Sequence, residues 1–311
     1  MEFFKKKTSI RFMAGRRWSY AVSGLLIVGS LLLLALRGLN LGIDFTGGVV
    51  IELAFPRTAE LDRVRAALAE AGYGEASVQS FGTTRDVLVR VMPEEGKDVN
   101  EVSNGVLEAI RSYEPGVEMR RSDVVGAQVG RELAEKGALA AIFAFLMILA
   151  YVALRFQWKL AVGSVIAALH DPIVVLGFFA ATHMTFDLPT LAAILAVVGY
   201  SLNDTVVVFD RIRERFALSR KDPPAKVIDT AINETLSRTL MTSITTMTAV
   251  LSLLIVGGDV LKGFATALAI GVVVGTFSSI YVASAIALDL KLTARDLMPA
   301  QREKGDVDAL P

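Results

Sequence analysis

The chain has 311 residues with 32 basic and 32 acidic side chains, so its formal net charge is zero and it offers no basic field for nucleic acid. It contains no cysteine and two histidines, which excludes disulfides and thiolate metal sites and leaves little material for a zinc site. Apolar residues make up 53% of the chain and charged residues 21%, a more apolar balance than that of a typical soluble domain.

Charged side chains are segregated from six long apolar stretches. Each stretch is near or above the roughly 20 residues that cross a bilayer as a helix. Within them the charged residues are Asp171 and Asp204. A soluble helical core would instead alternate charge with a period near 3.6 residues. The sequence therefore predicts an α-helical polytopic membrane protein. The expected transmembrane helices are 18–36, 137–154, 160–182, 188–209, 239–258 and 263–288.

Lysine and arginine are distributed unevenly between the two sides of these spans. They are frequent in the N-terminus (1–17), in the 210–238 loop and in the tail (291–311). The short loops on the opposite side contain few: 183–187 has no lysine or arginine, and 259–262 has one. By the positive-inside rule both termini are expected to be cytoplasmic, with the long 37–136 segment outside. The first span is too long for a signal peptide and is expected to remain as an anchor.

The 37–136 segment reads as a small α/β domain followed by a linker. Its pattern predicts strands at 49–55, 77–81, 86–92 and 117–125. Helices are expected at 58–71, with Thr58 as the N-cap, and at 98–112. This β-α-β-β-α-β order is typical of the ferredoxin-like fold, which supports many functions and identifies none. The remaining spans, over 137–290, form the expected membrane bundle.

Motifs for nucleotide or peptide hydrolysis are absent from the sequence. There is no G-x-x-x-x-G-K-[ST], no H-E-x-x-H and no G-x-S-x-G. The chain is therefore not expected to be an enzyme or to need a cofactor or metal. An ion gradient is the natural energy source for a membrane protein of this kind.

Asp204 is the strongest candidate for a proton-coupling residue. A carboxylate inside a transmembrane helix costs about 2.5–3.5 kcal/mol on insertion scales, so a chain keeps one there when it is paired, protonated or useful. Asn203 precedes it, and Arg238 starts the next span at about the same depth, with Thr242 four residues on along one helix face. The alternatives are an interhelical hydrogen bond for Asp204 and a snorkelling side chain for Arg238.

His170 and Asp171 lie before Pro172 near the middle of the third span. Histidine titrates nearest neutral pH, so this pair is a possible secondary proton relay. A buried, satisfied polar pair beside a proline kink explains the residues equally well.

Two glycine-containing patterns have mainly structural explanations. Small residues recur every four positions in the last span, among them Gly271, Gly275 and Ser279, which predicts a ridge for close helix packing. After the first span, the Gly42–Gly48 segment contains Asp44 and ends in Gly47 and Gly48, which permit a tight turn from helix to strand. Asp44 either caps this turn or binds something at the membrane surface.

The sequence resembles the SecF family of the resistance-nodulation-division superfamily. The matching stretches are GIDFTGG at 42–48, LHDPIVVLGFF at 169–179, GYSLNDTVVVFDRIRE at 199–214, LSRTLMTS at 236–243 and the small-residue repeat at 263–279.

This resemblance implies six spans in a bacterial inner membrane, with one large periplasmic domain. It also implies partnership with SecD in using the proton-motive force to promote export of unfolded preproteins through SecYEG. YajC and YidC are further candidate partners. It also implies that Asp204 and Arg238 lie on the proton path. Pro172 stands where the family pattern suggests a β-branched residue. The rival functions are export of small molecules or lipids by a related transporter, and a scaffold subunit that transports nothing.

Overall fold

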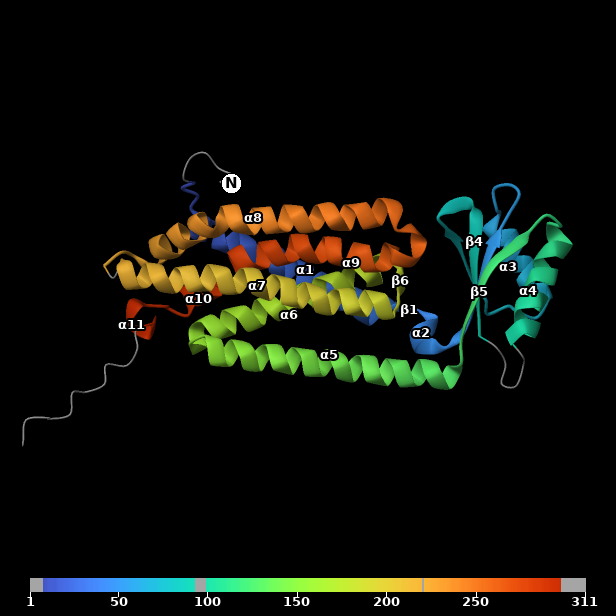
Figure 1. The fold of residues 1–311 in the computed structure, drawn as a ribbon, viewed down its shortest axis with the longest axis horizontal. Helices are drawn as coiled ribbons and strands as arrows, with labels where there is room; N and C mark the ends of the chain where they lie inside the picture. Colours follow the sequence, from blue (N-terminus) through green and yellow to red (C-terminus); the bar gives the residue numbers. More distant parts are fainter. Residues whose placement is uncertain (1–7, 93–98, 220, 298–311) are drawn as a thin grey trace, which may run out of the picture.

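The computed structural model describes residues 8–92, 99–219 and 221–297. Within these ranges, six helices are long and apolar enough to cross a membrane. They form an elongated bundle, and a four-stranded sheet with two helices stands beyond one of its ends (Figure 1). Residues 1–7 and 298–311 of the two expected cytoplasmic tails lie outside the described residues. Asp98, the expected first residue of the second outer helix, lies outside them as well.

The long helices lie at the expected places, but several extend further than the apolar stretches. They are α1 (Arg16–Arg37), α5 (Ala127–Arg155), α6 (Trp158–Thr182), α7 (Leu188–Leu218), α8 (Pro224–Val256) and α9 (Gly258–Phe277). The last span continues from α9 through a π-helix, η2 (Ser278–Ala283), into α10 (Ser284–Asp289).

Helix α5 starts ten residues before the predicted position, so the expected linker before residue 137 is helical. The reason is that charged residues end an apolar stretch without ending a helix. Alanine, glutamate, lysine and leucine are good helix formers, and Lys136 pairs with Glu132 one turn away at 3.7 Å. The expected 210–238 loop is also mostly helical, because the facing extensions of α7 and α8 bury Ile212 and Ile228 between them.

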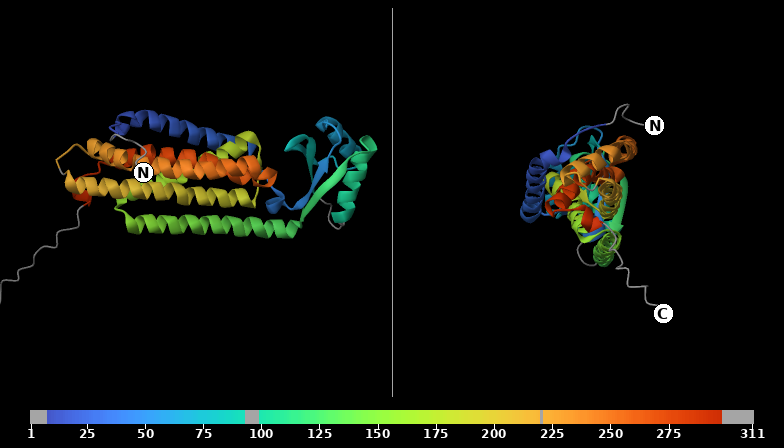
Figure 2. Two further views of the ribbon diagram at one scale, coloured as in Figure 1. Left: turned by 45° about the horizontal axis from the view of Figure 1, so that its top comes forward. Right: turned by 90° about the vertical axis from the view of Figure 1, so that its left-hand side faces the viewer.

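Helices α6, α7 and α9 form the centre of the bundle. About half of each of these spans is buried, whereas α1, α5 and α8 are largely exposed on the periphery. The end-on view in Figure 2 shows α1 and α5 at two edges of the bundle. Exposed leucine, phenylalanine and methionine side chains cover these outer helices, as expected of surfaces that meet lipid or other membrane helices.

The sheet unit is built from β2 (Gly48–Ala54), α3 (Leu61–Glu70), β3 (Ser77–Phe81), β4 (Thr83–Val91), α4 (Val99–Tyr113) and β5 (Glu118–Val125). The strand order is β3-β4-β2-β5, and every neighbouring pair is antiparallel. Helices α3 and α4 lie on the side of the sheet away from the bundle (Figure 1). Their apolar faces, which include Val64, Leu68, Val106 and Ile110, are buried against the sheet.

The predicted N-cap of α3 is wrong. Helix α3 starts at Leu61, with Glu60 in the cap position, rather than just after Thr58. The backbone N–H of Ala59 donates to Thr84 O at 2.9 Å, so the chain stays extended along the neighbouring strand for two more residues. This tertiary hydrogen bond outweighs the local preference of threonine for an N-cap.

A small joint connects the bundle to the sheet unit. Strand β1 (Asn40–Leu41), which follows α1, pairs in parallel with β6 (Thr185–Phe186), which precedes α7. A short helix, α2 (Ile43–Thr46), then leads into Gly47 and Gly48, whose φ angles are 72° and 123°. These positive values favour glycine, as the turn prediction required.

Both described ends of the chain lie at the end of the bundle that is remote from the sheet (Figure 2). The short helix η1 (Phe12–Gly15) is joined to α8, since Met13 N donates to Asp229 Oδ1 at 2.8 Å. The last short helix, α11 (Ala294–Leu297), is joined to α6, since Lys159 pairs with Asp296 at 2.7 Å. Partial burial raises the pKa of the Asp296 carboxyl group and is the largest single effect. The hydrogen bonds from Lys159 and Thr293 and the charge of Lys159 together outweigh it, so the pKa is lowered.

Candidate functional site

Asp204 lies on α7, 16 residues from the helix start, and only 2% of it is exposed. Its Oδ2 atom is buried without a hydrogen-bond partner. Arg238 and Thr242 of the adjacent helix α8 lie near the carboxyl group, and the Thr242 hydroxyl donates to Thr239 O at 2.9 Å. A buried carboxylate is unfavourable unless it is protonated or neutralised. The site can therefore hold a proton or accept a closer cation.

Arg238 lies near Asp204, but these two described side chains do not form an ion pair. The α7–α8 hairpin thus brings the two predicted residues into one region. Arg238 and Asn203 line a cavity of about 540 Å³. Its other walls carry the charged residues Asp210, Arg211, Glu214 and Glu234.

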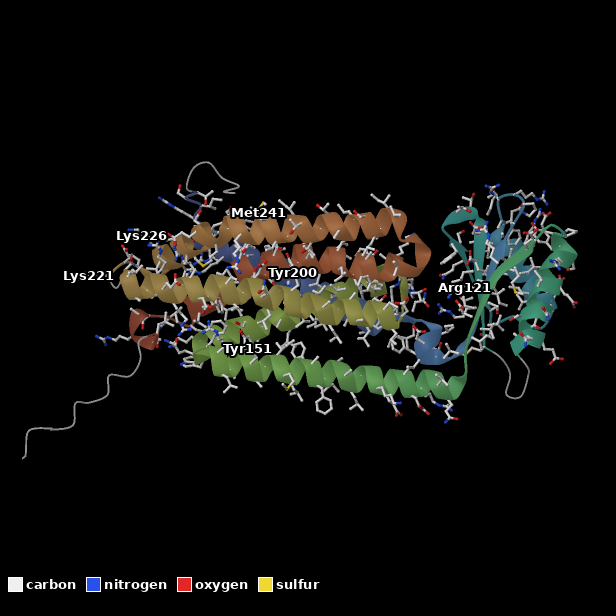
Figure 3. The ribbon with its side chains drawn as sticks, in the orientation of Figure 1. Arg121, Tyr151, Tyr200, Lys221, Lys226 and Met241 are labelled. Atoms are coloured by element: carbon white, nitrogen blue, oxygen red, sulfur yellow. The ribbon has the colours of Figure 1, made fainter. Side chains whose placement is uncertain are left out.

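This cavity belongs to the bundle end that is remote from the sheet. Figure 3 shows Lys221 and Lys226 at that end and Arg121 on the sheet, facing the opposite end of the bundle. Side chains at the wall of this cavity are accessible to water, whereas Asp204 is almost fully enclosed by protein. A buried carboxyl group therefore lies next to a cavity with polar and charged walls.

His170 and Asp171 form a second buried polar centre on α6. The His170 Nδ1 and Asp171 Oδ1 atoms are 2.9 Å apart, and both side chains are 0% exposed. Ser278 donates to Asp171 Oδ2 at 3.0 Å, and its oxygen is 3.4 Å from that of Ser201 on α7. His170 Nε2 is buried without a partner, so the pair is not fully satisfied.

Of the two helices that meet at this second centre, one is regular and the other contains a π-helical turn. Helix α6 continues through Pro172 without a break. The last span, by contrast, becomes π-helical at Ser278, the residue that contacts Asp171. Single turns of π-helix occur often at functional sites. Because Ser201 precedes Asp204 by three residues, the two buried carboxyl groups lie near neighbouring turns of α7.

Sequence reasoning did not identify a hydroxyl chain that crosses three helices. Tyr200 of α7 donates to Ser243 Oγ of α8 at 3.2 Å, and Ser243 lies 2.7 Å from Thr276 Oγ1 of α9. Tyr200 lies at mid-length of the bundle in Figure 3. Serine and threonine on α8 and α9 were visible in the sequence, but their contact with Tyr200 depends on the packing of three helices, which no sequence pattern specifies.

The small-residue ridge of α9 packs against α7 of the same chain. A Cβ atom on Gly271 would lie 2.0 Å from Val197 Cγ2, which is far inside normal contact distance. A Cβ atom on Gly275 would lie 3.0 Å from Ser201 Cβ and 3.4 Å from Asp171 Oδ2. Ser279, further along the ridge, is fully buried. The ridge thus lets α9 approach the helices that carry both buried carboxyl groups.

Asp44 binds the start of α7 rather than facing open solvent. Its Oδ2 accepts from Leu188 N at 2.9 Å, while Asp187, the N-cap residue, accepts from Thr190 N at 2.9 Å. Gly47 and Gly48 permit close approach, since a Cβ atom on Gly48 would meet Val91 O at 3.0 Å. Asp187 was not predicted, although an aspartate shortly before a proline is a recognisable helix start.

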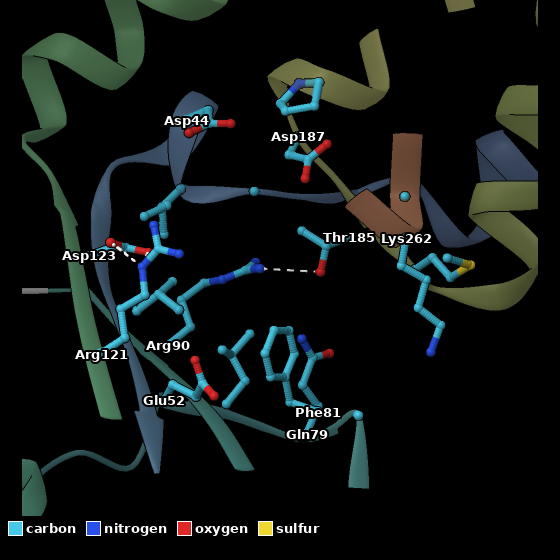
Figure 4. Close-up of a pocket in the computed structure, with 18 of the residues that line it drawn as sticks. Asp44, Glu52, Gln79, Phe81, Arg90, Arg121, Asp123, Thr185, Asp187 and Lys262 are labelled. Carbon is cyan, nitrogen blue, oxygen red and sulfur yellow. Dashed lines mark hydrogen bonds and ion pairs between the residues drawn. The ribbon is translucent and has the colours of Figure 1, made fainter. Parts of the chain in front are cut away.

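The region between the membrane spans and the sheet holds a larger cavity of about 700 Å³. Its lining combines Asp44 and Asp187 with residues of the open sheet face, including Arg90 and Arg121 (Figure 4). In the described part of the chain, no group of three histidine, aspartate or glutamate side chains is arranged to hold a metal ion.

Comparison with known families agrees with this architecture. Residues 106–293 match the family described as protein export membrane protein SecD/SecF, C-terminal. Residues 32–55, which contain Gly47 and Gly48, match the SecD/SecF GG motif. Over its whole length the chain is 46% identical to protein translocase subunit SecF of Vibrio alginolyticus, covering 99% of that protein.

The chain belongs to the SecF family. It is also 45% identical to the SecF subunit of Pseudomonas aeruginosa over 97% of its length and 98% of the relative. Among solved structures it resembles SecDF from Thermus thermophilus, described as a translocon-associated membrane protein, with 37% identity and a TM-score of 0.83 over 94% of the chain. A SecDF structure in a super-membrane-facing form matches over the same share with a TM-score of 0.66. The chain spans 40% of each SecDF chain.

Proposed function

We propose that this SecF-family protein works with SecD as a membrane subunit of the Sec export machinery and uses the proton-motive force to promote passage of unfolded preproteins through SecYEG. The single observation that carries the coupling step is Asp204, a buried carboxyl group with an unpartnered oxygen beside Arg238. YajC and YidC are further candidate partners of the complex.

The proposed cycle alternates Asp204 between two neutralised states. In one state the carboxyl group holds a proton. In the other it has lost the proton and is paired with Arg238, which moves in from its position at the cavity wall. One elementary charge crossing the membrane supplies about 2.3 kcal/mol per 100 mV. A few protons per cycle can therefore shift a two-state equilibrium strongly.

His170 and Asp171 form a proposed secondary relay. As a pair they can hold one proton on either residue without a net charge change, which a low-dielectric interior favours. Ser278 and Ser201 then connect Asp171 to the helix that carries Asp204. The unpartnered His170 Nε2 supports a relay over a fully satisfied structural pair.

SecD is the proposed direct partner. The matched region makes up 40% of the SecDF chain, and the name SecDF combines SecD with SecF. In this protein α1, α5 and α8 leave extensive apolar surface exposed. We infer that part of this surface contacts SecD helices in a composite bundle and that the remainder meets lipid.

The sheet unit is proposed to be a periplasmic ferredoxin-like domain. Its β-α-β-β-α-β connectivity and its strand order, β3-β4-β2-β5 with antiparallel neighbours, support that fold. Its position at the bundle end opposite both described chain ends supports a location outside the cytoplasm, given the basic residues near those ends. The protein would then reside in the inner membrane with cytoplasmic termini.

Single cysteines test this topology, because the natural chain has none. We expect Ser112→Cys, on the outer face of α4, to react with a membrane-impermeant thiol reagent in cells whose outer membrane alone is opened. Ser219→Cys, after α7, should react only once the inner membrane is also opened. The reverse labelling pattern would invert the proposed orientation.

The proposed function is tested by purification and reconstitution of the complex. Tagged protein from native membranes should carry SecD with it. Membrane vesicles that contain the complex should complete preprotein export faster when a pH gradient is imposed, and vesicles depleted of it should not respond. Equal responses in the two vesicle preparations would reject the coupling role, and absence of SecD would reject the partnership.

A further inference from the structure

Arg90 forms a direct link between the sheet unit and the membrane bundle. It lies at the end of β4, and its Nη1 atom donates to Leu41 O at 2.7 Å and to Asn40 Oδ1 at 3.3 Å. Its Nη2 atom reaches Thr185 Oγ1 at 3.5 Å, the contact drawn in Figure 4. One side chain of the sheet therefore contacts both strands of the β1–β6 ladder.

This ladder leads directly into α7. Thr185 belongs to β6, and Asp187, two residues on, is the N-cap of the helix. Asp44 binds the same helix end through Leu188 N. Figure 4 shows Asp44, Asp187 and Arg90 around the same cavity. Burial lowers the pKa of the Arg90 guanidinium, while the charges of Asp187 and Asp44 raise it. Arginine remains charged in either case.

Both covalent connections between the two parts pass through glycine residues. The chain enters the sheet through Gly47 and Gly48, both at positive φ. It leaves through Gly126, around which a Cβ atom would meet nothing within 4 Å. Glycine has the greatest backbone freedom, so these connections alone do not fix the orientation of the two parts. Noncovalent contacts hold it, among them those of Arg90 and the close packing of Gly47 against Gly130 of α5.

We propose that Arg90 is a positioning residue that couples the orientation of the outer sheet unit to the N-terminal end of α7, the helix that carries Asp204. This inference rests on the proposed function, in which Asp204 changes its protonation state. A guanidinium suits the role because its planar fork binds several acceptors in fixed geometry, unlike the single ammonium of lysine. A shift or tilt of α7 would move β6 and Asp187, and Arg90 would transmit that displacement to β4.

The test compares Arg90→Gln with Arg121→Gln in the complete complex in membranes. Arg121 is a matched control because it lines the same cavity but pairs with Asp123 of its own strand at 2.8 Å. Spin labels on cysteines at Ser112 and Ser252 report the distance between the sheet unit and the outer end of α8. We expect Arg90→Gln to broaden this distance distribution and Arg121→Gln to leave it unchanged, with SecD still bound in both.

The second measurement is gradient-driven export. Loss of hydrogen bonds to a charged group predicts a decrease of about tenfold in the gradient-dependent part of export for Arg90→Gln, and none for Arg121→Gln. Arg90→Lys should restore part of it. If Arg90→Gln does not accumulate, Arg90→Lys serves alone, and it should show a partial loss and a broadened distribution.

Normal export together with a normal distance distribution in the Arg90 variant would overturn the proposal. A normal distribution alone would also overturn it, because the link would then not fix the orientation. Failure of the proposed function is distinguishable. In that case Asp204→Asn leaves gradient-driven export intact, while the distance comparison between the Arg90 and Arg121 variants still decides whether the joint exists.

Discussion

Asp204→Asn is expected to remove the gradient-driven part of preprotein export while leaving assembly with SecD intact. Asparagine keeps the size and hydrogen-bonding capacity of aspartate but cannot exchange a proton. Each proton that no longer crosses removes about 2.3 kcal/mol per 100 mV, which is roughly fortyfold in an equilibrium constant. The measurement is the rate of export into inverted membrane vesicles with and without an imposed pH gradient.

Asp222→Asn is the matched control, because Asp222 lies in the exposed α7–α8 turn and pairs with Lys226 at 3.0 Å. It should export at the parental rate. Arg238→Lys should be partly impaired, since a point charge on a flexible stem replaces a planar fork. If Asp204→Asn retains the full response to the gradient, the residue has a structural role and the proposed cycle is wrong.

Gly271→Leu is expected to destabilise the folded bundle by more than 3 kcal/mol, and much of the protein should fail to accumulate. Overpacking a filled core typically costs 1–3 kcal/mol. Here even the first added carbon would lie 2.0 Å from Val197, a β-branched side chain with little freedom to move away. Thermal unfolding of the purified protein in detergent, together with its level in membranes, measures the effect.

The control for this substitution is Gly24→Leu. Gly24 also lies within a transmembrane helix, but a Cβ atom there would meet nothing within 4 Å, so the added side chain faces outward from α1. It should leave the melting temperature nearly unchanged. Parental stability of Gly271→Leu would mean that α9 and α7 do not approach each other as closely as described.

The positions of the membrane helices were predictable because a bilayer imposes a strong rule: charged residues are excluded over about 20 positions. Helix ends were less predictable, because no such rule applies outside the membrane. Helix α5 continues through Glu132 and Lys136 for this reason. The start of α3 depended on a hydrogen bond between Ala59 and Thr84, which are distant in sequence.

The candidate site was predictable in its membership but not in its detail. Asp204 and Arg238 were placed together because consecutive antiparallel helices return to the same depth. The distance between their side chains depends on side-chain conformations that no sequence pattern specifies. The contact of Asp171 with Ser278 was equally hidden, since it requires the π-helical turn η2. The β1–β6 ladder has two residues per strand, which is too short for a periodic signal.

The last span contacts other helices both before and after its π-helical turn, so the number of residues between these contacts matters. Ahead of the turn, Gly271 and Gly275 lie against α7, whereas Ala283 O, at the last residue of the turn, lies against Gly163 of α6. Asp289 at the far end of the span accepts from Arg16 and Tyr20 of the first helix. Each residue turns an α-helix by about 100°. Removing one residue from an α-helical part of this span would therefore rotate the Asp289 carboxylate away from the first helix, so the span tolerates substitution far better than a change in residue count.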